Sequence, residues 1–161
     1  MTGFLPARNV SPTPRSDYEV DAETLLRALS WEDEGDDLIA IFHSHPASPA
    51  YPSLIDAAKA FYPDSVYLIL SLRAPDVPEL KGYFLRPEAI FRGEQAAILR
   101  REIPLQQVRP GLWGHRLAST EPKTPLLAPR ARPEADLYLV YDRPNGPIRL
   151  IAVQPADILL R

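Results

Sequence analysis

Proline is the residue type that most limits how this chain can fold. The 161 residues include 19 prolines and only 7 glycines, whereas proline averages roughly 5% of residues in globular proteins. Proline is excluded from the interiors of helices and from central strands. The sequence therefore predicts short elements joined by stiff connections, and it excludes a bundle of long helices.

The remaining composition is that of an ordinary globular chain and excludes several kinds of site. Hydrophobic residues make up 45% and charged residues 24%, and the formal net charge is −3. The length suits about one domain with a real core. Cysteine is absent, which excludes disulfides, thiolate zinc sites, iron–sulfur clusters and cysteine nucleophiles. The slightly acidic balance argues against a general nucleic-acid binder.

The sequence predicts neither a membrane segment nor a secretion signal. No stretch reaches the ~18 uninterrupted apolar residues of a membrane helix. The opening residues, MTGFLPARNV, lack the apolar centre of a signal peptide. We therefore expect a cytoplasmic protein that makes no membrane contact.

The first half of the chain alternates helical and extended patterns between turn signals. Asp21 is a plausible N-cap for a helix that runs to about Trp31. The other expected elements are a strand at 38–42, a helix at 53–61, and strands at 66–72 and 80–86. This order predicts an α/β or α+β layer fold, with a mixed sheet that is mostly buried and flanked by helices.

The second half gives weaker signals. Residues 94–103 favour a strand, and 107–135, with several prolines, favour either extended or loop structure. Strands at 137–141 and 148–153 flank Asn145-Gly146, the strongest short-range hairpin signal. We therefore expect a small, β-rich C-terminal extension.

One short stretch combines residues that can bind a metal. His43 and His45 stand two apart at the end of a predicted strand, so both imidazoles face the same side. Asp56 lies in the first turn of the next predicted helix, and Ser53 at its start could donate to an oxyanion. Two nitrogens and one carboxylate oxygen leave a position open on tetrahedral zinc, which is typical of catalytic sites.

Each part of this stretch also has an ordinary structural interpretation. Two histidines at a strand end are more often unliganded than metal-bound. Ser53 and Asp56 match a helix-capping pattern, with serine at the N-cap and an acidic side chain three residues on. The combination of both parts within one strand, loop and helix favours a metal site.

The same residues resemble a known family signature. His43-Ser44-His45-Pro46, then six residues, then Ser53-x-x-Asp56, is similar to the motif of the JAMM metalloproteases, or MPN-plus domains. The neighbouring pattern agrees, with an apolar strand before the motif, a helix after it and then the strand VYLILSL. The resemblance covers about residues 3–92 and is closest to bacterial members. It implies an MPN/JAMM-like domain at 1–104, followed by an extension at 105–161.

The resemblance implies roles for the four motif residues. His43, His45 and Asp56 would be zinc ligands, and Ser53 would help to stabilise a tetrahedral intermediate. The family hydrolyses peptide or isopeptide bonds after the C-terminal glycines of ubiquitin-like proteins. Bacterial members act on sulfur-carrier proteins of the ThiS and MoaD types, and some release an amino acid such as cysteine.

The family also uses a glutamate on an earlier strand as general base. If Gly3-Phe4-Leu5 is the run that follows this glutamate, the glutamate falls at or before Met1. Glu19 and Glu23 are the nearest glutamates before the motif, and neither is an obvious substitute. Three explanations stay open: a late-start form of an active enzyme, a zinc-binding variant with little hydrolysis, or a base of another kind.

The sequence is therefore compatible with three functions. The first is a zinc hydrolase that cleaves after the Gly-Gly end of a carrier protein. The second is a zinc-binding module that holds a carrier or partner protein with weak or no turnover. The third is an interaction domain without metal, in which His43 and His45 are loop residues.

Overall fold

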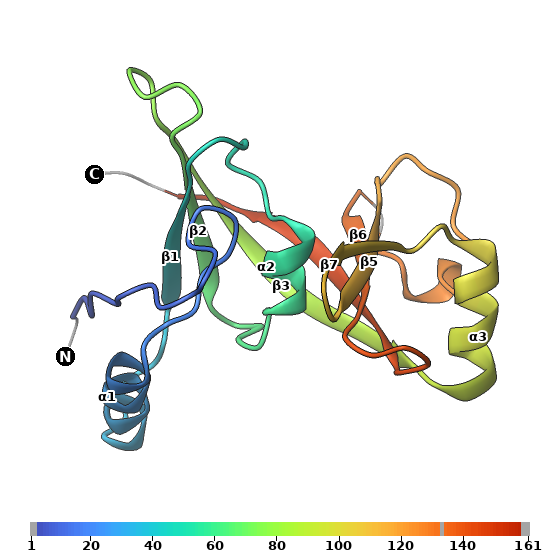
Figure 1. Ribbon diagram of the computed structural model, residues 1–161, viewed down its shortest axis with the longest axis horizontal. Coiled ribbons are helices and arrows are strands. Elements are labelled where there is room, and N and C mark those ends of the chain that lie inside the picture. Colours follow the sequence, from blue (N-terminus) through green and yellow to red (C-terminus); the bar gives the residue numbers. More distant parts are fainter. Residues whose placement is uncertain (1–2, 133, 159–161) are drawn as a thin grey trace. The chain divides into compact units, whose positions relative to one another are not determined.

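The computed structural model describes residues 3–132 and 134–158 (Figure 1). It contains three α-helices, one short 3-10 helix and seven strands among these residues. They are α1 (Ala22–Asp33), β1 (Ala40–His45), α2 (Leu54–Ala58), β2 (Val66–Ser71), β3 (Glu79–Phe91), α3 (Gly93–Glu102), β4 (Gln106–Arg109), β5 (Leu112–Leu117), η1 (Ala128–Arg130), β6 (Asp136–Tyr141) and β7 (Ile148–Ala156). The expectation of a mixed α+β fold with helices flanking sheet strands is confirmed.

The chain divides into two compact units. The first comprises Met1–Tyr51 and Tyr67–Lys81, and the second comprises Pro52–Val66 and Gly82–Arg161. In the first unit, helix α1 begins at Asp21, whose side chain accepts a hydrogen bond from the backbone N–H of Thr24. This is the predicted N-cap. Strands β1 and β2 are neighbours in the sheet.

The second unit is an antiparallel sheet with a helix on each face. Its strand order is β3-β7-β6-β5-β4, and all neighbouring pairs are antiparallel. Because side chains alternate along a strand, Leu137 and Leu139 of β6 face one side and pack with Leu99 of α3 in the core. Tyr138 of β6 faces the other side, where α2 lies.

One secondary-structure prediction in the second half is wrong. Residues 94–103, expected as a strand, form helix α3 and its C-cap. The buried positions Ala96, Leu99 and Ile103 have helical spacing, but the short apolar run at 96–99 also suits a strand. Residues 107–135, expected as extended or loop structure, contain the extended strand β5 and most of β4, joined by a turn in which Gly111 has a φ of +77°.

The predicted hairpin is confirmed. Strands β6 and β7 pair antiparallel around the loop that contains Asn145, which has a φ of +59°. One proline accompanies an irregularity in the longest strand. Pro87 lies within β3, where the register with β7 shifts, and a bulge of this kind is one of the few places where a strand accepts proline.

Candidate metal centre

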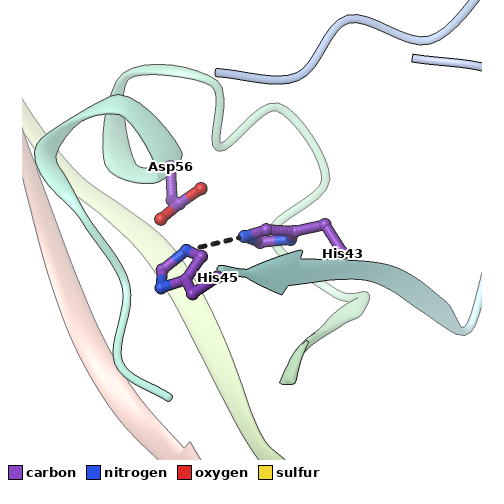
Figure 2. Close-up of side chains that lie close together, drawn as sticks. All are labelled: His43, His45 and Asp56. Carbon is purple, nitrogen blue, oxygen red and sulfur yellow. Dashed lines mark hydrogen bonds between the residues drawn. The ribbon is translucent and has the colours of Figure 1, made fainter. Parts of the chain in front are cut away.

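The end of β1 brings two imidazole rings together. His43 Nε2 and His45 Nε2 lie 3.2 Å apart, and the ring centroids are separated by 5.0 Å (Figure 2). This is the same-side arrangement that the spacing of two residues predicts for an extended chain. The strand continues to His45, so both histidines belong to a regular element rather than to the following loop.

The loop after β1 fixes the ring of His45. Its Nδ1 lies 2.9 Å from the carbonyl oxygen of Pro49. A carbonyl only accepts hydrogen bonds, so Nδ1 carries the proton, and the neutral ring presents a lone pair at Nε2. Metal-binding histidines commonly donate their second ring N–H to a carbonyl in this way. His45 is only 9% exposed.

Further contacts hold this loop and the second ring. The hydroxyl of Ser71 donates to the carbonyl of Ser48 at 2.7 Å, and the N–H of Leu72 donates to the carbonyl of His45 at 2.9 Å. Tyr18 stacks on the ring of His43, with a centroid separation of 4.6 Å and an interplanar angle of 24°. These contacts restrict both the loop path and the plane of the His43 ring.

The third predicted ligand lies at the start of α2. Ser53 is the N-cap, and its hydroxyl and backbone N–H both donate to Asp56 Oδ2 at 2.6 Å. The N–H of Asp56 donates in return to Ser53 Oγ at 3.2 Å. The capping box that the sequence suggested is therefore formed. It fixes the side chain of Asp56, which is 2% exposed.

The structure brings the three predicted ligands together. One possible ligand atom from each of His43, His45 and Asp56 lies within 4.8 Å of the others. Figure 2 shows the carboxylate of Asp56 facing the two rings. Among the described residues, this is the one group of three or more such side chains with this geometry.

The donor set fits zinc. Two nitrogens bound at 2.0–2.1 Å to a tetrahedral zinc lie roughly 3.3–3.4 Å apart, close to the 3.2 Å between His43 Nε2 and His45 Nε2. Two imidazoles and one carboxylate are typical zinc ligands and leave one position for water or substrate. The fit rests on three side chains whose orientations are each fixed by a neighbouring contact.

The structure places Ser53 in the capping box, where its hydroxyl proton is donated to Asp56. Its predicted catalytic role stays a prediction. The glutamates considered as a base, Glu19 and Glu23, are both exposed. The metal-binding group contains no glutamate from the described part of the chain.

Two residues near these side chains were not predicted. Tyr18 stacks on His43, and Tyr138 of β6 hydrogen-bonds to Pro52, which precedes Ser53. Burial raises the pKa of the Tyr138 phenol well above its ordinary value, and the carboxylates of Asp136 and Asp56 add to the rise. Tyr138 belongs to no recognisable motif, so the sequence held no signal for it.

The fold and this group of side chains define an α+β protein with a candidate His-His-Asp metal site. A family model described as prokaryotic homologs of the JAB domain matches residues 3–84, just over half of the 161-residue chain. The chain belongs to this family. The resemblance to JAMM-type proteins is thereby confirmed.

Curated relatives carry names that refer to protein conjugates. Desampylase of Haloferax volcanii is 42% identical over 72 residues, which cover 44% of this chain and 52% of that protein. CysO-cysteine peptidase of Mycobacterium tuberculosis is 34% identical over 80 residues, covering 49% and 54%. The probable TtuB-protein conjugate cleaving protease of Thermus thermophilus is 47% identical over 57 residues, covering 35% and 38%.

The chain thus spans about half the length, or less, of the curated relatives it matches. No solved structure gives a significant match. Within the described residues, no helix has the length and apolarity needed to cross a membrane.

Proposed function

We propose that this protein is a zinc-dependent hydrolase of peptide or isopeptide bonds after the C-terminal Gly-Gly of a ubiquitin-like or sulfur-carrier protein. The observation that carries this proposal is the meeting of His43, His45 and Asp56 within 4.8 Å in a chain of the prokaryotic JAB family. The names of the relatives support the substrate class, since they refer to CysO, TtuB and desampylation.

In this proposal His43, His45 and Asp56 hold the ion. Zinc bound there would polarise the scissile carbonyl and activate water for attack. The carbonyl of Pro49 keeps the proton of His45 on Nδ1 and so directs the Nε2 lone pair to the ion. Water adds across the amide bond, leaving a carboxyl group on the carrier and an amine on the departing group.

Ser53 is the proposed oxyanion donor. Its hydroxyl donates to Asp56 Oδ2 at 2.6 Å, and rotation about one bond would turn the same proton toward a substrate oxygen. Its backbone N–H also donates to Oδ2, so the cap keeps one bond when the hydroxyl turns. Ser53 is therefore proposed both to cap α2 and to stabilise developing negative charge.

A second function follows from the composition of the metal-binding group. No glutamate of the described residues belongs to it, and a general base is typically worth about 10²–10⁴-fold in rate. The alternative is a zinc-binding module with weak or no hydrolysis that binds a carrier or partner protein.

Several expectations stay predictions alongside this proposal. They are a division into an MPN/JAMM-like domain at 1–104 and an extension at 105–161, a carrier of the ThiS or MoaD type, a cytoplasmic location, and no nucleic-acid partner.

A conjugate-cleavage assay tests the proposal. Carrier proteins that end in Gly-Gly, joined through a peptide or isopeptide bond to cysteine or to lysine, are incubated with the zinc-loaded protein, and released carrier is measured by mass spectrometry. The hydrolase predicts release that a chelator stops and that Asp56→Ala abolishes. Carrier binding without release in the zinc-loaded protein would instead support the binding module.

A further inference from the structure

The sheet of the second unit contacts both ends of α2. At the N-terminal end, the hydroxyl of Tyr138 on β6 donates to the carbonyl of Pro52, the residue before the N-cap. At the C-terminal end, Arg149 on β7 donates to the carbonyl of Ala58 at 2.6 Å. Because α2 has only five residues, it is far too short to be stable by itself, and its orientation depends on such contacts.

The contact between Tyr138 and Pro52 is buried. Tyr138 is 2% exposed, and Pro52 is also buried. Water therefore cannot readily replace either partner, and loss of the hydroxyl would leave the carbonyl of Pro52 unsatisfied.

Leu54, the first residue of α2, packs closely against strand β5. A Cβ added to Gly114 of β5 would lie 2.8 Å from Leu54 Cδ2 and 2.9 Å from the carbonyl oxygen of Leu139. Leu54 follows the Ser53 N-cap directly. The start of α2 is therefore fixed by packing against β5 as well as by the hydrogen bond from β6.

We propose that Tyr138 is a positioning residue for the carboxylate of Asp56. It holds the carbonyl of Pro52, which fixes Ser53 and hence the capping box that orients Asp56. The inference rests on the proposed zinc site. It also gives the strands after residue 105 a role at the metal centre.

The test compares Tyr138→Phe with the matched control Tyr141→Phe, a tyrosine on the same strand that stacks on Trp113. Zinc affinity is measured in the full chain by competition with a chromophoric chelator, and the Co²⁺-substituted absorption spectrum reports ligand geometry. Tyr138→Phe should weaken zinc binding by roughly 10- to 100-fold, as loss of a supporting contact typically does, and should alter the spectrum. Tyr141→Phe should match the wild type in both.

A third measurement does not depend on metal. In the metal-free protein, Tyr138→Phe should speed hydrogen exchange of the Ser53 and Asp56 amides, which the capping box protects, and Tyr141→Phe should not. Arg149→Met acts on the other end of the helix and is the second variant if Tyr138→Phe does not fold. It should also weaken zinc binding.

The outcomes separate the two proposals. If the wild type binds zinc and Tyr138→Phe binds it equally well with unchanged amide exchange, the positioning role is overturned. If the wild type binds no zinc, the proposed function fails, and amide exchange in the metal-free protein then decides the positioning role alone.

Discussion

At the scale of single residues, the carboxylate of Asp56 combines helix capping with the proposed metal-binding role. Its Oδ2 accepts two hydrogen bonds from Ser53, and the same side chain lies with His43 and His45. A carboxylate offers about four lone-pair sites, so capping and metal binding are compatible. The two interpretations of Ser53-x-x-Asp56, as a cap and as part of a metal site, do not exclude each other.

Removal of the Ser53 hydroxyl tests the role of Ser53 as the N-cap of α2. Ser53→Ala loses the bond from the N–H of Asp56 and the donor to Oδ2. We expect the free energy of unfolding in urea to fall by about 1 kcal/mol. Ser53→Thr, which keeps a hydroxyl, is the control and should stay close to the wild type. Equal stability of Ser53→Ala and the wild type would contradict the capping role.

The grouping of the three candidate ligands was predictable because these residues are close together in the sequence. His43, His45 and Asp56 occupy one strand, one loop and one helix start, so spacing alone places them on adjacent elements. Tyr138 could not be predicted, since its contact with Pro52 joins residues 86 apart in the sequence. Such a contact depends on the register of the sheet, which no local pattern specifies.

At the scale of secondary-structure elements, the sequence predicted an element correctly where its local pattern favours a single conformation. The Asn145-Gly146 turn predicted the β6–β7 hairpin because few residues adopt the required positive φ easily. The prediction failed for α3, since its apolar run suits either conformation until it packs. Burial of Leu99 in the core with Leu137 settles the choice, and this tertiary contact is invisible in the sequence.

The packing of α2 on β5 gives a second prediction. Gly114→Ala introduces a Cβ within 3 Å of both Leu54 and a backbone oxygen, so a backbone shift is required. Overpacking of this kind typically costs about 1–3 kcal/mol, and we expect a loss of that size in urea unfolding. Gly35→Ala is not a suitable control because its φ is +95°. Ala118 is half-buried and lies outside the strands. Ala118→Gly should therefore change the free energy of unfolding much less.

The N-terminus of α1 gives a prediction for pH dependence. The N–H of Thr24, then the N–H of Arg8, hold the pKa of Asp21 below its ordinary value. A lowered folded-state pKa means that the stabilisation is present above the unfolded-state pKa and is lost as pH falls through the folded-state pKa. Between about pH 5 and pH 2, the helical ¹³Cα shifts of the first turn should therefore decrease.

The matched variant is Asp21→Ser, which keeps a capping oxygen without a titrating group. Its ¹³Cα shifts in the first turn should change much less over the same pH range. An equal decrease in both proteins would show that another group is responsible.

At the scale of the whole molecule, the residues that the family model matches differ from the residues of the sheet that contact α2. The match ends at residue 84, whereas Gly114 and Arg149 contact α2 and Tyr138 contacts the residue before its N-cap. The helix that carries Asp56 thus depends on strands outside the matched region. A truncation after residue 104 is expected to leave α2 without these contacts.

Metal binding should stabilise the folded chain as a whole. A ligand that binds only the folded state adds RT ln(1 + [L]/Kd), about 2.7 kcal/mol at a free zinc concentration of 100 times Kd. The Tm should therefore rise with zinc and fall with a chelator. His43→Ala should lose this response, and His115→Ala, a histidine on β5 outside the metal-binding group, should keep it. A zinc response of equal size in His43→Ala would contradict the site.

The most direct test of the central claim is the zinc content of the purified chain without a histidine tag, measured by elemental mass spectrometry. We expect about one zinc per chain in the wild type and in Asp64→Ala, a variant of an exposed aspartate outside the group of His43, His45 and Asp56. We expect almost none in Asp56→Ala. Absence of zinc from the zinc-supplied wild type, or undiminished zinc in Asp56→Ala, would contradict the proposed zinc site.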